Sequence, residues 1–151
     1  MQKDSTPAPL APNPNPSMVV AAAISENGRF GASSDWGGTI IIWDMETGEP
    51  VWSLPEAHGE GNRVMGLDFS PGDQTLVSSG DNGVYLWNAN NGDPIGQMPE
   101  NNGYLDVAFS PDGEMIMAGS WVVGVFLWDV NMGELLHHFE TEDKTLLKKA
   151  D

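Results

Sequence analysis

The feature that most constrains the fold of this chain is an internal repeat with a period of about forty residues. Three short apolar runs each end in a tryptophan, and these residues, Trp43, Trp87 and Trp128, stand 44 and 41 residues apart. Upstream of each run, an apolar stretch leads into a polar turn. These turns lie at residues 23–28, 68–73 and 108–113. Two signals at matching offsets in three successive units indicate one structural unit repeated three times.

Each unit has the pattern of four short strands joined by tight turns. In the second unit we expect strands at residues 64–69, 75–79, 84–87 and 94–98, where β-branched and apolar residues concentrate. The Ser-Pro-Asp-Gly sequence at residues 110–113 suits a tight turn, because proline presets φ, aspartate binds backbone amides and glycine accepts positive φ. Each unit is therefore predicted to be a four-stranded antiparallel sheet, and a period of 40 to 45 residues is typical of propeller blades.

On these residues the chain resembles the WD-repeat β-propeller family. Blades of that family begin with a strand that leads into Ser-Pro-Asp-Gly, and their third strand ends in Trp-Asp. The resemblance covers about residues 18–140, and it implies an all-β fold of three four-stranded antiparallel WD-type blades. We place these blades at about residues 18–57, 58–99 and 100–140. The motifs are specific for the fold and say little about function.

The chain departs from the family pattern at several polar positions. The Gly-His pair that usually opens a repeat is represented only by His58, in the sequence Ala-His-Gly. Asp35 and Asp81 are counterparts of the family's aspartate in the turn before the third strand, whereas the third repeat reads Ser-Trp-Val-Val-Gly at residues 120–124. The resemblance therefore implies an incomplete Trp-Ser-Asp-His hydrogen-bond network in every blade, and blades that are individually weak.

Three blades are too few for a single-chain ring, because the resemblance implies rings of at least four blades and commonly seven. An open stack of three sheets exposes two apolar end faces, which is more than a monomeric protein tolerates in water. Three explanations remain open. Two copies close a six-bladed ring, a protein partner covers the exposed blade faces, or the sequence is a piece of a longer protein.

The two ends of the sequence differ in composition from the repeats. Residues 1–17 contain five prolines among small and polar residues, which predicts an extended tether. Residues 141–151 hold three of the six basic residues of the chain and form a charged C-terminal tail.

Charge and composition exclude several classes of protein. Twenty-two acidic and six basic residues give a formal charge of −16, so the chain lacks the basic surface that nucleic acids require, and basic protein partners are favoured. Without cysteine there is no disulfide, cysteine nucleophile or thiolate metal site. No apolar run is long enough for a transmembrane segment. As written the chain is expected to be soluble: cytoplasmic, or extracytoplasmic if Met1 replaces a processed end.

Tryptophans provide two kinds of candidate residue. Trp43, Trp87 and Trp128 recur with the repeat period and are interpreted as structural core rather than as an aromatic ligand cage. Trp36 and Trp121 both precede the third-strand tryptophan by seven residues, in a turn, and Val122 and Val123 follow Trp121. Apolar residues at a turn tip are typical of partner interfaces, so these four residues form the candidate partner-binding surface. The alternative is that the third turn is degenerate and tucks inward.

The sequence offers no constellation for catalysis or for a cofactor. His137 and His138 are adjacent on an expected strand and therefore point to opposite faces, which prevents them from chelating one metal ion. His58 is interpreted as a loop-network histidine rather than a catalytic base. The carboxylates fall mostly in turns, and no calcium loop, phosphate loop or nucleophile elbow is present. Weak calcium binding by the acidic turns stays open.

The sequence therefore predicts a non-enzymatic protein-interaction or scaffold module that is a subunit of a larger assembly. One alternative is a self-assembling partial propeller that closes a six-bladed ring as a homodimer or forms a higher assembly. A further alternative, a ligand-sensing or enzymatic propeller, has no catalytic residues to support it.

Overall fold

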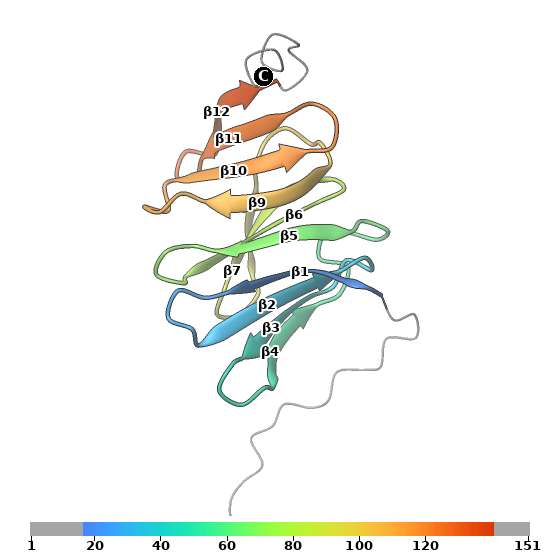
Figure 1. Ribbon diagram of the computed structural model, residues 1–151, viewed down its shortest axis with the longest axis vertical. Coiled ribbons are helices and arrows are strands. Elements are labelled where there is room, and N and C mark those ends of the chain that lie inside the picture. Colours follow the sequence, from blue (N-terminus) through green and yellow to red (C-terminus); the bar gives the residue numbers. More distant parts are fainter. Residues whose placement is uncertain (1–16, 141–151) are drawn as a thin grey trace, which may run out of the picture.

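A computed structural model describes residues 17–140 of the chain, which form three four-stranded antiparallel sheets (Figure 1). Blade 1 consists of β1 (Val19–Ile24), β2 (Phe30–Asp35), β3 (Ile40–Asp44) and β4 (Pro50–Leu54). Blade 2 consists of β5 (Val64–Phe69), β6 (Thr75–Gly80), β7 (Gly83–Asn88) and β8 (Pro94–Gln97). Blade 3 consists of β9 (Tyr104–Phe109), β10 (Met115–Ser120), β11 (Val125–Asp129) and β12 (Glu134–Phe139). In each blade the strands lie in chain order across the sheet.

A serine closes the first turn of every blade by the same hydrogen bond. The hydroxyls of Ser25, Ser70 and Ser110 accept from the backbone N–H five residues further on, at distances of 2.9, 3.0 and 3.0 Å. In blades 1 and 3 the glycine of this turn, Gly28 or Gly113, has a positive φ that other residues adopt at a cost. The repeated turn sequence therefore fixes the register of the first hairpin in each sheet.

The three blades stack through their first strands. Strand β5 lies between β1 and β9, and it contacts both (Figure 1). One apolar cluster joins blade 1 to blade 2 and includes Ile42, Leu76 and Trp87. A second cluster joins blade 2 to blade 3 and includes Val77 and Trp128. The core of the protein therefore lies between the sheets, as in a propeller.

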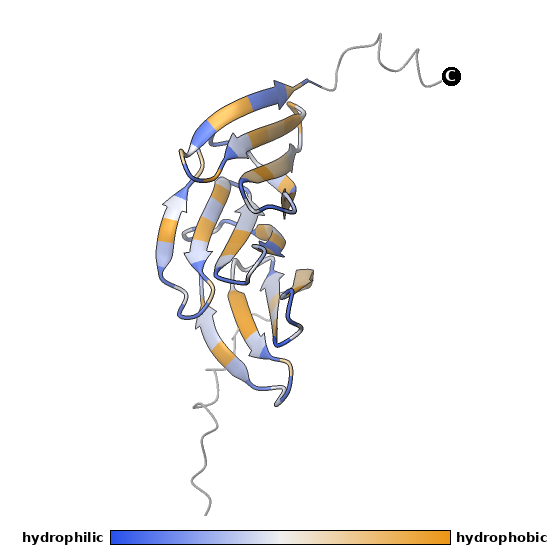
Figure 2. Ribbon diagram, turned by 90° about the vertical axis from the view of Figure 1, so that its left-hand side faces the viewer, coloured by the Kyte–Doolittle hydropathy of each residue, from blue (hydrophilic) through white to orange (hydrophobic). Residues whose placement is uncertain are grey.

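The stack is bowed and does not close into a ring (Figure 2). Blade 2 is covered on both faces, whereas blades 1 and 3 each have one face without a neighbouring sheet in the part of the chain that the structure describes. The predicted fold class, three four-stranded blades that are incomplete as a ring, is confirmed. The predicted tether at residues 1–17 and the tail at residues 141–151 lie outside the described residues, apart from Ser17.

Candidate protein-interaction surface

The middle blade contains a buried hydrogen-bond network around Ser78. Its hydroxyl accepts from the indole N–H of Trp87 at 2.7 Å, and it lies 2.7 Å from Nε2 of His58. Burial lowers the pKa of His58 to about 4, so the imidazole is neutral at physiological pH. Asp81 does not complete the network, because its carboxylate binds Arg63 instead. These residues hold the blade together and present no reactive group to solvent.

The corresponding networks in the outer blades are smaller. In blade 1 the indole N–H of Trp43 donates to the Ser33 hydroxyl at 2.9 Å. In blade 3 the position of Ser78 is occupied by Ala118, and the indole of Trp128 donates to the carbonyl of Pro99 at 3.0 Å. Trp87 and Trp128 are buried, whereas Trp43 is only half-buried, because no other sheet of the described region packs on its face of blade 1.

The turns between the second and third strands differ between the middle blade and its neighbours. Strands β6 and β7 of blade 2 are joined by two residues, Asp81 and Asn82. The equivalent turns of blades 1 and 3 have four residues each, 36–39 and 121–124, and each begins with a tryptophan. The longer turns let Trp36 and Trp121 reach toward blade 2 from either side.

Arg63 of blade 2 lies against both of these tryptophans. Its guanidinium carbon is 5.3 Å from the ring centroid of Trp36 and 5.0 Å from that of Trp121, within the range of cation–π contacts. The same guanidinium donates to both carboxylate oxygens of Asp81 and forms an ion pair with it at 2.9 Å. This hydrogen bonding lowers the pKa of Asp81 and raises that of Arg63, so both groups stay charged and the arginine is held in place.

Around this arginine, side chains from all three blades form one exposed surface. We call Trp36, Arg63, Trp121, Val122 and Val123 the tryptophan patch. The exposed fractions are 48% for each tryptophan, 68% for Val122 and 38% for Val123. Four of the five patch residues also line a shallow depression of about 390 Å³. Its lining includes Arg63, Asp81, Asn102, Trp121, Val122 and Val123.

Trp121 is partly supported by its own domain. Its ring lies so close to Gly103 that a Cβ at that glycine would be 3.0 Å from the indole, and its backbone N–H donates to the Gly103 carbonyl. One face of the side chain is therefore covered by protein, and nearly half of its surface remains in solvent. The third turn neither tucks fully inward nor projects freely.

Sequence reasoning selected Trp36, Trp121, Val122 and Val123, and the structure places them together. Arg63, the cation that lies against both tryptophans, was not among the residues predicted from the sequence. The available signal was that Arg63 is one of only two basic residues between positions 17 and 140, directly before the first strand of its blade. Nothing in that position indicates which aromatic rings it meets.

The histidines near the C-terminal strand do not form a site. The His138 ring stacks on Phe126, with centroids 4.1 Å apart, whereas His137 lies beside Phe139. Within residues 17–140, no group of three or more histidine, aspartate or glutamate side chains is arranged to hold a metal ion. Two turn carboxylates, Asp44 and Asp112, cap their own turns by accepting backbone N–H groups. In the described part of the chain there is also no helix that would be long and apolar enough to cross a membrane.

Comparisons with known proteins agree with this architecture. A family model described as "WD domain, G-beta repeat" matches residues 11–44, 48–88 and 92–121. The chain is also similar to the small ribosomal subunit protein RACK1y of Oryza sativa subsp. japonica, with 23% identity over 171 aligned positions. This alignment covers 81% of the chain and 51% of the relative, so the chain spans about half the length of the curated relative it matches.

Proposed function

Because this chain belongs to the WD-repeat family, we propose that it is a non-enzymatic protein-interaction scaffold whose partner binds the tryptophan patch. The observation that carries the proposal is the contact of Trp36 and Trp121 with one arginine, which gathers apolar and aromatic surface from three blades. Aromatic residues and arginine are the types most enriched where binding energy concentrates in protein interfaces.

The patch is fixed before a partner arrives. Arg63 is held by Asp81, and Trp121 rests on Gly103, so little side-chain freedom is lost on binding. Ordering of side chains is one of the main costs of association, and a rigid aromatic surface lowers it. Val122 and Val123 extend the apolar area, since 68% of Val122 and 38% of Val123 are exposed.

Charge favours a partner with basic residues. Residues 17–140 contain eighteen acidic residues and two arginines, and both arginines already pair with carboxylates of this chain. A basic partner is attracted to such a surface and associates faster, most strongly at low salt. A lysine or arginine side chain of the partner also suits the face of Trp36 that Arg63 does not cover.

The relative supports a place in a larger assembly. By its name, RACK1y is a protein of the small ribosomal subunit and therefore works as one component of a multi-chain particle. We propose a subunit role of the same general kind for this chain, without extending the relative's own assembly to it.

The experiment compares peptide binding by two variants of the tryptophan patch with binding by one control variant. A library of random peptides is selected on the wild-type chain, and the dissociation constants of the enriched peptides are then measured with each variant. We expect peptides rich in basic and aromatic residues. Trp121→Asp combined with Val122→Asp, and separately Trp36→Ala, should weaken binding by about 30-fold, which corresponds to an interface residue worth about 2 kcal/mol.

The matched control is Met132→Asp, a substitution in the turn between β11 and β12. Met132 is as exposed as Val122, at 68%, and lies in another turn of the same blade. The control should bind the peptides like the wild type. Enriched peptides that bind all variants equally, or that lack basic residues altogether, would contradict the proposed surface.

A further inference from the structure

The two sheet interfaces inside the chain follow one rule. Each sheet has one face that bears its third-strand tryptophan and one face that does not. In both interfaces the face with the tryptophan packs on the face without a tryptophan of the preceding blade. Trp87 and Leu76 of blade 2 pack on Ile42 of blade 1, and Trp128 of blade 3 packs on Val77 of blade 2. We call the first kind the tryptophan face and the second kind the acceptor face.

Among residues 17–140, no sheet lies against the tryptophan face of blade 1. Strand pairing places Trp43 and Ile41 on this face, with Ser33 and Ser53 beside Ile41. Val51 alternates with the inward-facing Trp52 on β4 and is 43% exposed. The face therefore carries the same kinds of side chain that blades 2 and 3 bury at their internal interfaces.

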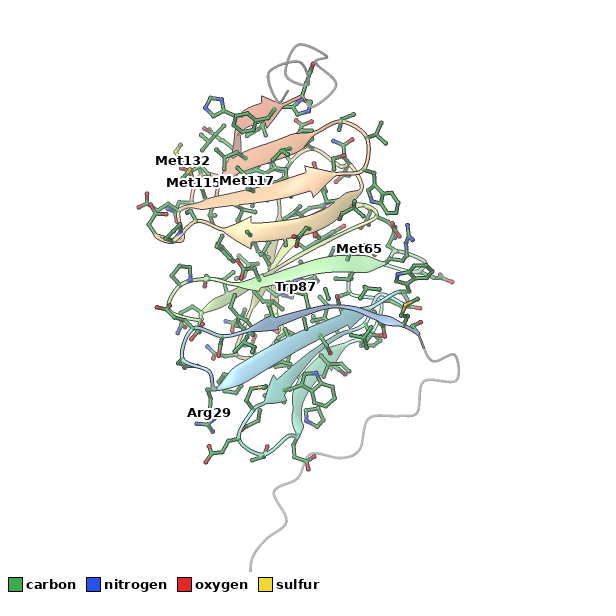
Figure 3. All side chains as sticks on the ribbon, viewed as in Figure 1. Arg29, Met65, Trp87, Met115, Met117 and Met132 are labelled. Carbon is green, nitrogen blue, oxygen red and sulfur yellow. The ribbon has the colours of Figure 1, made fainter. Side chains whose placement is uncertain are left out.

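The acceptor face of blade 3 likewise has no sheet against it in the part of the chain that the structure describes. Met117 pairs with Leu127 across β10 and β11, just as Val77 pairs with Leu86 across β6 and β7. Val77 and Leu86 are 0% and 4% exposed, whereas Met117 is 45% exposed and Leu127 is half-buried. Phe139, which pairs with Val125 on the same face, is 47% exposed. Figure 3 shows Met117 on blade 3, remote from Trp87 in the middle of the stack.

We propose that a second copy of this chain covers these faces, with the tryptophan face of blade 1 in one copy packed on the acceptor face of blade 3 in the other. The described part of each copy carries one unpaired face of each kind, at opposite ends of the stack, and these are the two kinds of face that pair inside the chain. The pairing continues the rule by which blades 2 and 3 already dock. A head-to-tail contact of this kind gives a closed ring of two copies when the rotation that relates the copies is a half turn. The bowed shape of the stack is suited to such closure (Figure 2).

Charge makes the association dependent on salt. Each copy has a formal charge of −16, so two copies repel one another at low ionic strength. At physiological salt the Debye length falls to about 8 Å, and the repulsion is largely screened while the apolar faces still attract. Salt should therefore strengthen this pairing, the opposite of its effect on a basic partner at the tryptophan patch.

Sedimentation of the full chain at low and high salt, over a wide range of concentration, tests the proposal. The wild type should reach twice the monomer mass of 16.3 kDa, at lower concentration in high salt. Met117→Asp and Val51→Asp each place a charge in both contacts of the pair, and each should raise the dissociation constant at least about tenfold. Ile95→Asp is the matched control, because Ile95 is a 56% exposed strand residue of the middle blade.

Mixing the two variants identifies the head-to-tail arrangement. A pair of one Met117→Asp chain and one Val51→Asp chain contains one contact with two wild-type faces and one contact with a charge on both faces. A single aspartate is expected to open a contact, and a second charge adds little to a contact that is already open. The mixture, which keeps one intact contact, should therefore associate more tightly than either variant alone. Thermal melts show whether each variant folds, and Met117→Gln replaces the aspartate variant if that one unfolds.

Three outcomes would overturn the proposal: a wild type that stays monomeric in high salt, variants that associate like the Ile95→Asp control, or a mixture no tighter than its components. The patch variant, Trp121→Asp with Val122→Asp, should still pair, because its substitutions lie in a turn. A failure of the pairing is therefore distinguishable from a failure of the proposed partner surface.

Discussion

Blades 2 and 3 have nearly the same sequence pattern and yet differ in how they are buried. Val77 of blade 2 and Met117 of blade 3 occupy equivalent positions, but their exposed fractions are 0% and 45%. Both blades pair their strands in the same order, and both bury the third-strand tryptophan. The difference arises because a sheet lies on each side of blade 2, whereas within residues 17–140 one face of blade 3 has no sheet against it.

The two blades also differ in their internal hydrogen bonds. Blade 2 links Trp87, Ser78 and His58 inside the sheet stack, whereas blade 3 has Ala118 in place of the serine and uses the Pro99 carbonyl. Tyr104 fills the space beside Trp128, with ring centroids 5.6 Å apart. Blade 2 therefore combines a polar network with ring packing among His58, Tyr85 and Trp87, whereas blade 3 relies on aromatic packing. We therefore expect single substitutions to cost the most stability in the middle blade.

The largest expected effect is that of Trp87→Ala. Truncation of a buried aromatic side chain costs about 3–5 kcal/mol, and Trp87 packs between blades and binds Ser78. Trp43→Ala, at the half-buried equivalent position of blade 1, should cost clearly less. Denaturant melts of both variants measure the difference. A loss under about 1 kcal/mol for Trp87→Ala, or equal losses for the two, would break the comparison between covered and uncovered blades.

The second prediction concerns pH and His58. Above pH 6.5 the His58 imidazole is mostly neutral in both the folded and the unfolded chain. Between pH 6.5 and about 4 it is protonated in the unfolded chain and stays neutral in the folded chain. The folded state should therefore lose up to about 3 kcal/mol over this window and no more from this group at lower pH. His58→Gln removes the titration, so the difference between wild type and variant isolates the effect. Parallel pH profiles of the two proteins would show that His58 titrates normally in the fold.

The smallest expected effect is the difference in stability loss between serine-to-alanine variants of blades 2 and 1. Ser78→Ala leaves the indole N–H of Trp87 and a nitrogen of His58 without their buried partner, which should cost about 2 kcal/mol. Ser33→Ala removes a single partner of the half-buried Trp43, where water substitutes, and should cost under about 1 kcal/mol. Chemical melts of the two variants rank them, and the reverse order would contradict the role assigned to the middle blade.

Much of the fold was predictable from local signals. The strands expected at residues 64–69, 75–79, 84–87 and 94–98 agree with β5 to β8 within one residue at each end. The repeated serine turns and the third-strand tryptophans were sufficient for this, because turn chemistry and alternation act over a few residues. The candidate surface was predicted only in part. Trp36 and Trp121 lie 85 residues apart in the sequence, and no local pattern indicates that both meet Arg63.

Three repeated local patterns were enough to predict three blades, the order of the strands within them and the tryptophans that mark them. Three other features follow from the way the sheets stack: which equivalent residues are buried, the pairing of Asp81 with Arg63 instead of the histidine network, and the meeting of two turns at one cation. The physical reason is that burial and charge pairing depend on which sheets become neighbours, and equivalent residues in identical strands acquire different surroundings once the sheets stack.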